Sequence, residues 1–379
     1  MIKGRLRVPG DKSISHRAVM FGSIAKGTTY IKGFLTGADC ISTVSIFKKM
    51  GIDIELNDTS VKVYGNGLYG LKKPKEILDC GNSGTTTRLV SGILSAQEFT
   101  SVLTGDNSIQ KRPMSRIITP LSMMGANITS NNGFAPLTIT GSKLYGIEYK
   151  SPVASAQVKS AILLAGLYAQ SPTTVTEPAK SRDHTELMLK KFGASLTSSK
   201  NSVTVNPCNE LFASDIAVPS DISSAAFFVA AAILVPGSEL VLENVGINPT
   251  RDGIIRILKK MGANIEIINH TDTFEPVADI SVSYSKLHST TVEGDIIPTL
   301  IDELPILAAI ACLAEGTTVI KDAVELKVKE SNRIHVMCNE LSKLGVDVVE
   351  TEDGMEITGT NKLCGNVTIA THDDHRIAM

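Results

Sequence analysis

Two cations, two hydroxyls and an imidazole lie within six residues of the segment Pro9-Gly10-Asp11-Lys12-Ser13-Ile14-Ser15-His16-Arg17. Pro-Gly turns the chain, and Asp11 or Ser13 can cap a helix that continues into a small apolar run. Lys12 and Arg17 then lie near a helix N-terminus, where free N–H groups and the helix dipole already favour an anion. The segment predicts a phosphate or carboxylate site; the alternative is a solvated turn.

This segment is not a nucleotide-binding P-loop. Asp11 separates Gly10 from Lys12, and Gly4 lies six positions before Gly10 where the motif requires five. The run at residues 65–70 matches the GxGxxG pattern of dinucleotide-binding proteins, but lysines and a proline follow it where that fold requires a helix. We therefore expect a loop leaving a hairpin there.

Further polar clusters occur where a strand would end and a helix begin. Residues 79–88 contain two glycines followed by an arginine, and residues 111–116 contain three cations. Residues 155–159 and 181–184 offer polar donors in equivalent places, and the second group is expected to cap a helix. Each cluster alone could be a solvated turn. Together they predict a cleft for two anionic substrates with acid–base chemistry between them, lined by Lys12, Arg17, Arg88, Arg112, Gln157, Asp302, Glu330, Arg333 and Arg376.

Two of these residues are candidates for proton transfer. Asp302 precedes an apolar helix, where helix capping explains it as well as catalysis does. Glu330 lies between Lys329 and Arg333, so we expect an ionised carboxylate that can transfer a proton. The alternative for Glu330 is a salt-bridged helix face.

Composition excludes several classes of protein. The 379 residues are 42% hydrophobic and 20% charged with a net charge of −2, which indicates a globular protein of two or three domains without a field that attracts nucleic acid or anionic lipid. Six scattered cysteines without a CxxC pair argue against structural zinc, and no apolar leader begins the chain, so we expect a cytoplasmic protein. The acidic and histidine-rich residues 372–376 lack partners at ligand spacing, and we predict no metal.

The elements that must position these residues repeat along the chain. An amphipathic run that ends in glycine and leads into two alternating strands occurs five times, at Gly51, Gly125, Gly193, Gly262 and Gly345. A helix of small apolar residues occurs six times, starting near residues 13, 84, 155, 222, 303 and 375. Because these glycines are spaced too widely for the units of a solenoid, we predict two domains of three units, with crossings near Gly10 and residues 218–221.

Two segments carry separate expectations. The longest apolar run, residues 225–236, is too short to span a bilayer and predicts a buried helix. The sixth unit stops at Met379 in mid-helix, so we expect that the chain lacks its last few dozen residues.

Seven strings of residues, in order from residue 3 to 379, closely resemble the EPSP synthase (3-phosphoshikimate 1-carboxyvinyltransferase) family of enolpyruvyl transferases: PGDKSISHRA, GNSGTTTR, TGDNSIQKRPM, SAQVKSA, IDELP, KVKESNR and DDHRIAM. The resemblance implies an α/β protein of two domains, an inside-out α/β barrel in which each domain has three βαβαββ repeats and the two close over substrates at a hinge. The first domain would comprise residues 1–10 and 219–379, C-terminally incomplete, and the second residues 11–218.

The resemblance also implies the reaction and its residues. The family transfers the enolpyruvyl group of phosphoenolpyruvate to the 5-hydroxyl of shikimate 3-phosphate through a tetrahedral intermediate, without metal or organic cofactor. Asp302 would take the hydroxyl proton, Glu330 would protonate the methylene carbon, and Lys12 would assist. Shikimate 3-phosphate would be bound by Lys12, Ser13, Arg17, Ser155, Gln157, Ser181, Asp302 and Lys329. Phosphoenolpyruvate would be bound by Lys12, Asn82, Gly84, Arg112, Gln157, Arg333, His375 and Arg376.

Departures from the family pattern leave some properties open. Ala156 replaces a frequent serine, Leu89 a frequent proline and Glu325 an asparagine, so sensitivity to the herbicide glyphosate is undecided, although Gly84 leaves the usual space. A family lysine that helps to bind phosphoenolpyruvate falls in the C-terminal segment absent here, so we expect impaired binding or activity. We expect a monomer with small-molecule substrates and no membrane or nucleic-acid partner.

Two rival functions remain. The related transferase acting on UDP-N-acetylglucosamine has Lys-Asn in the first turn and a loop cysteine, where this chain has Lys12-Ser13 and Met114-Ser115. A non-catalytic phosphosugar-binding remnant is the other.

Overall fold

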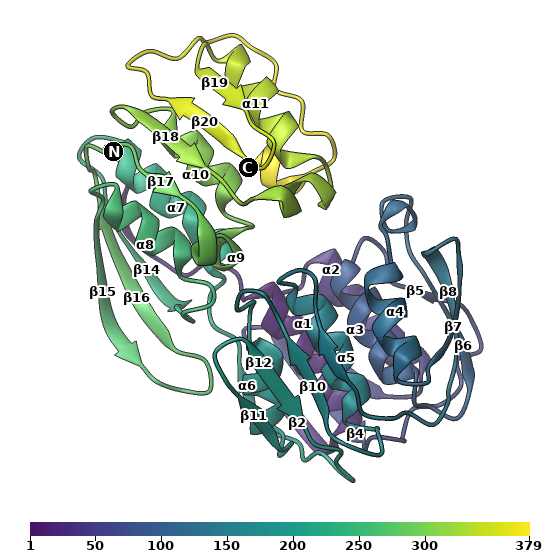
Figure 1. Ribbon diagram of the computed structural model, residues 1–379. Helices are drawn as coiled ribbons and strands as arrows, with labels where there is room; N and C mark the ends of the chain where they lie inside the picture. Colours follow the sequence, from purple (N-terminus) through teal and green to yellow (C-terminus); the bar gives the residue numbers. More distant parts are fainter. The chain divides into compact units, whose positions relative to one another are not determined.

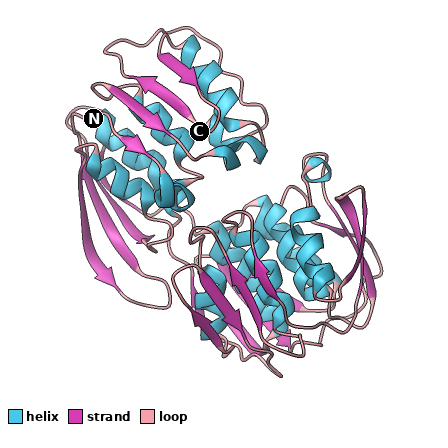
Figure 2. Cartoon of the chain, viewed as in Figure 1, coloured by secondary structure: helices cyan, strands magenta, loops and turns pink.

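The computed structural model describes residues 1–379, which divide into two compact units. Unit 2 is Gly10–Val218, and unit 1 combines Met1–Pro9 with Pro219–Met379. Both units are mixtures of helices and four-stranded sheets, as Figure 2 shows in cyan and magenta, so the predicted α/β class is confirmed. No helix combines the length and apolar character needed to cross a membrane.

Unit 2 contains three sheets of one design, in which a parallel pair of strands continues into an antiparallel pair. The first, in spatial order, is β13 (Ile216–Ala217), β2 (Lys26–Lys32), β4 (Ser60–Asn66) and β3 (Asp53–Asn57). The second is β5 (Leu78–Asp79), β6 (Thr100–Thr104), β8 (Phe134–Thr140) and β7 (Asn127–Asn131). The third is β9 (Glu148–Lys150), β10 (Thr173–Thr176), β12 (Ser202–Val205) and β11 (Leu196–Ser198).

Unit 1 repeats this sheet twice. One sheet is β1 (Lys3–Leu6), β14 (Glu239–Gly246), β16 (Val277–Ser283) and β15 (Asn264–Thr271). The other is β17 (Thr291–Val292), β18 (Thr317–Ile320), β20 (Met355–Thr358) and β19 (Asp347–Glu350). A short helix, α12 (His375–Ala378), follows, and its Ile377 packs into the hydrophobic core of this unit.

The leading strands of two repeats are exchanged along the sequence. β1, at the start of the chain, pairs in parallel with β14 of unit 1, so that Lys3 lies opposite Glu239. β13, near the end of unit 2, pairs in parallel with β2 near its start. Two sheets are therefore completed only when strands distant in sequence come together.

One helix of small apolar residues begins each repeat. These helices are α1 (Lys12–Ile24), α3 (Gly84–Leu94), α5 (Ala156–Gly166), α7 (Ile222–Leu234) and α10 (Leu304–Ala311), with α12 in the sixth position. In unit 2 the three helices are almost wholly buried among the sheets (Figure 1). Their N-caps are Asp11, Ser83 and Ser155, whose side chains each accept a backbone N–H from the first turn.

The amphipathic helices are α2 (Ala38–Lys49), α4 (Ser115–Met123), α6 (His184–Lys191), α8 (Gly253–Lys260) and α11 (Arg333–Lys343). Each is followed by its predicted glycine, which adopts a φ between +80° and +97°. Since a side chain is strained at these angles, the glycines end the helices as the sequence predicts. The run at residues 65–70 leaves β4 without opening a helix, as predicted.

Two predictions about helices need correction. The run that forms α7 is buried on one face only, and Phe228 is 42% exposed, because this helix packs against β14, β16 and α10 along one side. The cap predicted for α6 within residues 181–184 falls on Asp183, which occupies the N-cap position, but its side chain makes no cap hydrogen bond.

Candidate active site

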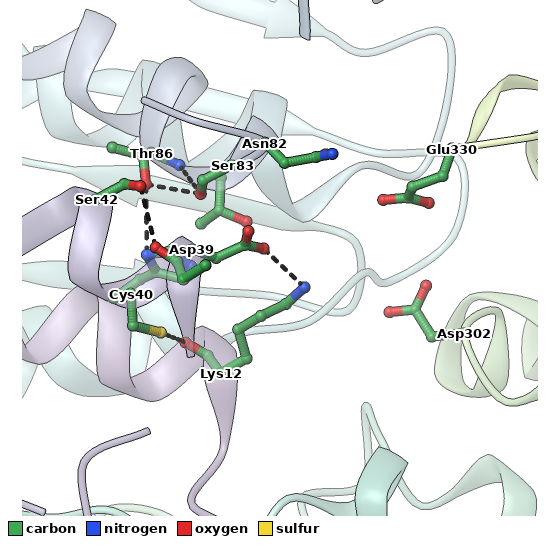
Figure 3. Close-up of polar contacts among 12 residues, drawn as sticks. Lys12, Asp39, Cys40, Ser42, Asn82, Ser83, Thr86, Asp302 and Glu330 are labelled. Atoms are coloured by element: carbon green, nitrogen blue, oxygen red, sulfur yellow. Dashed lines mark hydrogen bonds and ion pairs between the residues drawn. The ribbon is translucent and has the colours of Figure 1, made fainter. Parts of the chain in front are cut away.

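Lys12 is the first residue of α1, as its sequence position predicted. Its Nζ lies 3.2 Å from Oδ2 of Asp39, which belongs to the first turn of α2 (Figure 3). Both side chains are about one-third exposed, so the ion pair contributes little to stability and the ammonium group can be reached by a ligand. Asp11 rather than Ser13 caps this helix, accepting the N–H of Ile14 at 2.8 Å.

A buried chain of polar side chains supports this helix start from behind. Nδ1 of His16 lies 2.7 Å from Oγ1 of Thr43, which lies 2.7 Å from Oγ1 of Thr86, which donates to Oγ of Ser83 at 2.7 Å. Figure 3 shows the end of this chain at Ser83, the N-cap of α3. Burial, reinforced by the charge of Lys12, lowers the pKa of His16 to about 3. The imidazole is therefore neutral at physiological pH.

Arg17 lies deeper than a surface cation would. It is 3% exposed and donates to Oγ1 of Thr185 at 2.7 Å, the carbonyl of Ser13 at 2.9 Å and Oγ of Ser160 at 3.0 Å. The guanidinium group thereby ties α1 to α5 and α6. Its contact with a phosphate stays a prediction.

The start of α3 gathers a second group of predicted residues. Nη1 of Arg88 donates to Oε1 of Gln157 at 2.6 Å, and Nη2 of Arg112 donates to Oδ1 of Asn82 at 2.8 Å. Gly84 lies between the two guanidinium groups, since an added Cβ would stand 2.7 Å from Nη1 of Arg88 and 3.3 Å from Nη1 of Arg112. Two cations at one helix N-terminus form a site suited to an anion.

Ser155 and Ser181 share one buried partner, Glu177. Its Oε1 accepts the backbone N–H of Ser155 at 2.9 Å, and its Oε2 accepts the hydroxyl of Ser181 at 2.9 Å. Lys159 forms an ion pair with the same carboxylate at 2.9 Å. Unit 2 therefore brings together the predicted residues at the starts of α3 and α5 and in the loop that precedes α6.

In unit 1, Arg333 connects the two residues predicted to transfer protons. Nη2 of Arg333 lies 2.6 Å from Oε2 of Glu330, and Nη1 lies 3.6 Å from Oδ1 of Asp302. Figure 3 shows the carboxyl groups of Asp302 and Glu330 near each other. Asp302 is not a helix cap, because Glu303 holds the N-cap position of α10. The capping alternative for Asp302 is thus wrong.

Asp374 contacts Arg333 through both of its carboxylate oxygens. Its carboxylate accepts from Nε at 2.9 Å and from Nη2 at 3.1 Å, and it also accepts the hydroxyl of Ser331 at 2.9 Å. Burial alone would raise the pKa of Asp374, but hydrogen bonds and charge from Arg333 outweigh it, and the pKa lies below its ordinary value. Burial would lower the pKa of Arg333, but its carboxylate partners raise it. The cation is thereby fixed in a charged, 2% exposed position.

The remaining predicted residues lie around this cluster. Lys329 follows a short 3-10 helix, Val324–Val328, and directly precedes Glu330. His375 and Arg376 begin α12, and Oδ1 of Asp374 accepts the backbone N–H of Arg376 at 3.0 Å. The structure contains no group of three or more His, Cys, Asp or Glu side chains that could hold a metal ion.

Sequence reasoning missed two partners of the predicted residues, Asp39 and Glu177, and it included Lys159 only as one of the polar residues 155–159. The only signal for Glu177 is its place directly after β10, where its repeat changes from strand to loop. Asp374 was noticed only as a possible metal ligand. Contacts such as these join residues far apart in sequence, which motif spacing does not report.

The fold and these contacts define a class of protein. It is an α/β protein built from repeats, with arginines and lysines at helix N-termini in its units. In unit 1, a single arginine contacts two carboxylates. These are the parts of an acid–base enzyme for anionic substrates. A family model described as EPSP synthase (3-phosphoshikimate 1-carboxyvinyltransferase) matches residues 1–379. The chain belongs to the EPSP synthase family.

Similar proteins agree with this assignment. The chain is 55% identical to a 3-phosphoshikimate 1-carboxyvinyltransferase of Bacillus velezensis over 381 residues, covering 100% of this chain and 89% of the relative. It is 57% identical to the protein of that name from Thermoanaerobacter sp. over 380 residues, with the same coverage. A solved EPSP synthase from Acinetobacter baumannii superposes with a TM-score of 0.87 at 49% identity, covering 100% of this chain and 87% of that one.

Proposed function

We propose that this protein transfers the enolpyruvyl group of phosphoenolpyruvate to the 5-hydroxyl of shikimate 3-phosphate, giving 5-enolpyruvylshikimate 3-phosphate and phosphate. The observation that carries the proposal is the family match over the whole chain, with relatives of that name at 55% and 57% identity. The reaction belongs to the shikimate pathway of aromatic amino-acid biosynthesis. The names of these relatives favour it over the rival transfer to a UDP-sugar.

Unit 2 supplies groups that bind anions. Lys12, Ser13, Arg17, Ser155, Gln157 and Ser181 bind shikimate 3-phosphate, with help from Lys329. Lys12, Asn82, Gly84, Arg112 and Gln157 contribute to phosphoenolpyruvate binding, together with Arg333, His375 and Arg376. Support comes from the placement of two arginine guanidinium groups beside Gly84 and of Lys12 at the N-terminus of α1.

Unit 1 supplies the proton transfers. Asp302 removes the proton from the 5-hydroxyl as that oxygen forms a bond to C2 of phosphoenolpyruvate, and Glu330 adds a proton to C3, which becomes a methyl group. The C2–O bond to phosphate then breaks, C3 returns a proton, and the proton held by Asp302 leaves with the phosphate. Arg333 supports the placement of the two carboxyl groups, because one guanidinium group contacts both of them.

The test follows product formation by purified full-length protein. Phosphate release and 5-enolpyruvylshikimate 3-phosphate are measured with shikimate 3-phosphate and phosphoenolpyruvate, and separately with UDP-N-acetylglucosamine in place of the first substrate. Turnover only with the UDP-sugar would overturn the proposal. Binding of shikimate 3-phosphate without turnover would favour the phosphosugar-binding remnant.

Site-directed variants test the roles of the carboxylates. Asp302→Asn and Glu330→Gln should each lower kcat by about 100-fold or more while shikimate 3-phosphate still binds, because a general acid or base contributes about 100-fold to 10,000-fold. Asp295→Asn is the matched control, since Asp295 is an exposed carboxylate of the same unit. An Asp302→Asn enzyme with the kcat of the control would remove Asp302 from the mechanism.

A further inference from the structure

Unit 2 contains a buried ionic cluster that the reaction itself does not use: Lys159, Glu177 and Glu186. Nζ of Lys159 lies 2.9 Å from Oε2 of Glu177 and 2.8 Å from Oε1 of Glu186. The side chains are only 3%, 3% and 7% exposed. Burial would lower the pKa of Lys159, but the two carboxylates raise it, so the lysine is charged. Removing three charged groups from water is costly, so the cluster is weak evidence for a purely stabilising role.

The two carboxylates of this cluster have different surroundings. Glu186 lies within α6, and its second oxygen makes no hydrogen bond. Glu177 uses both oxygens: Oε1 accepts the N–H of Ser155 at 2.9 Å, and Oε2 accepts the hydroxyl of Ser181 at 2.9 Å and its N–H at 3.4 Å. Lys159 also donates to the carbonyl of Ser181 at 3.4 Å. One carboxylate therefore fixes two segments that are separated in sequence by the whole of α5 and β10.

These segments are the start of α5 and the loop between β10 and α6. Ser155 is the N-cap of α5, and Ser181 is 5% exposed in the loop. A loop side chain that binds a ligand is more effective when the loop is already ordered, because ordering it only on binding costs conformational entropy. Ser181 also accepts a hydrogen bond from Lys159 through its backbone carbonyl, but Glu177 is the charged side chain that contacts both serines, so it is the group best placed to hold both.

We propose that Glu177, held in place by Lys159, is a positioning residue that presets Ser155 and Ser181 for shikimate 3-phosphate. The inference rests on the proposed function, in which these two serines bind that substrate. A hydroxyl carries one proton, so Ser181 turns its O–H from Glu177 to the ligand on binding. The backbone N–H groups of both serines stay on the carboxylate throughout. Glu177 touches neither substrate and acts on affinity, not on the chemical step.

The test compares the two carboxylates that share Lys159. In full-length protein, Glu177→Gln should weaken the Kd of shikimate 3-phosphate, measured by titration calorimetry, by about ten-fold, or about 1.4 kcal/mol. Its KM for that substrate should rise in parallel while kcat changes by less than about three-fold. Glu186→Gln removes an equivalent buried charge but no contact with the serines, and its Kd should stay within about two-fold. Lys180→Met, which removes an exposed lysine that pairs with Asp183 in the same loop, is the matched control.

Other outcomes are equally decisive. If Glu177→Gln and Glu186→Gln lose the same affinity, the cluster is only structural and the inference is overturned. If Glu177→Gln does not fold, Glu177→Asp keeps the ion pair while shortening the reach to the serines, and an unchanged Kd for Glu177→Asp would refute the positioning role. Ser181→Ala distinguishes failure of the proposed function from failure of this inference. If Ser181→Ala leaves the Kd of shikimate 3-phosphate unaltered, the proposed binding role of Ser181 is wrong. If it weakens binding but Glu177→Gln does not, only the positioning role of Glu177 is wrong.

Discussion

Gly84 lies against the guanidinium group of Arg88, so that a Cβ on this glycine would stand 2.7 Å from Nη1 of Arg88. The obstacle is the far end of a flexible side chain, which can move. The same nitrogen donates to Gln157 at 2.6 Å. A methyl group at residue 84 therefore acts on the anion-binding geometry and not on the packing of the fold.

Gly84→Ala should accordingly separate affinity from stability. The melting temperature should change by less than about 2 °C, because no backbone atom obstructs the methyl group. The KM for phosphoenolpyruvate should rise by about five-fold or more as Arg88 leaves Gln157. Steady-state kinetics and calorimetry of the same preparation measure both, and an unchanged KM would remove Gly84 from the proposed phosphoenolpyruvate site.

Gly92→Ala, two turns further along α3, should lower stability instead of affinity. A Cβ there would overlap the backbone carbonyl of Ala161 in α5, and a backbone atom cannot turn aside. Overpacking of this kind costs about 1–3 kcal/mol, which lowers the melting temperature of unit 2 by about 3–10 °C. Scanning calorimetry gives the shift. A melting temperature equal to that of the parent would mean that α3 and α5 are not in the close contact described here.

His16 should make stability depend on pH. Its pKa is about 3 in the folded chain, because it is buried and lies near Lys12, whereas an exposed histidine has a pKa of 6.5. Between these values the unfolded chain binds a proton that the folded chain does not, so stability is lost as pH falls below 6.5. The loss is at most about 1.4 kcal/mol per pH unit.

His16→Asn should remove the contribution of His16 to the change of unfolding free energy with pH. The free energy of unfolding of parent and variant is compared between about pH 7.5 and pH 5, on either side of the ordinary histidine pKa. Only the change with pH is used, since the substitution also alters the contact with Thr43. Parallel curves for the two proteins would show that His16 keeps the pKa of an exposed histidine in the folded chain.

Asp374→Asn should destabilise unit 1 through Arg333. Asparagine can still cap α12, so the main change is the loss of a charge that accepts two hydrogen bonds from a buried guanidinium group. Breaking a buried ion pair costs about 3–5 kcal/mol, or about 6–15 °C in melting temperature for a unit of this size, which scanning calorimetry measures. Asp373→Asn is the control, because that neighbour is exposed and has a positive φ that asparagine tolerates. Equal melting temperatures for the two variants would contradict the role given to Asp374.

The repeating elements were predictable because their signals are local. A glycine at the end of each amphipathic helix is required by a backbone angle that other residues avoid, and that requirement is visible in sequence wherever it recurs. The sequence left two candidates for the cap of α1, Asp11 and Ser13, because aspartate and serine are both favoured at the N-cap position. The residue type identifies which side chains can cap the helix, and the backbone conformation at the turn determines which of them does.

The site was predictable in its residue types but not in its partners. Arg333 was expected to meet a substrate, yet it also holds Asp302 and Asp374, which lie in quite different parts of the sequence. Glu177 was not found at all. Such pairings depend on how repeats fold back on one another, and nothing in the spacing of charges along a chain encodes which carboxylate a cation will meet.

The pairing of β1 with β14 sets an order of events during synthesis. Residues 3–6 are synthesised before unit 2, but their partner strand, which begins at Glu239, is made only after all of unit 2. Meanwhile unit 2 can finish, because its last strand, β13, ends at Ala217. Strand β1 therefore stays unpaired while unit 2 is synthesised and folds. A fragment that starts at Pro219 would lack β1 and would carry an open sheet edge along β14.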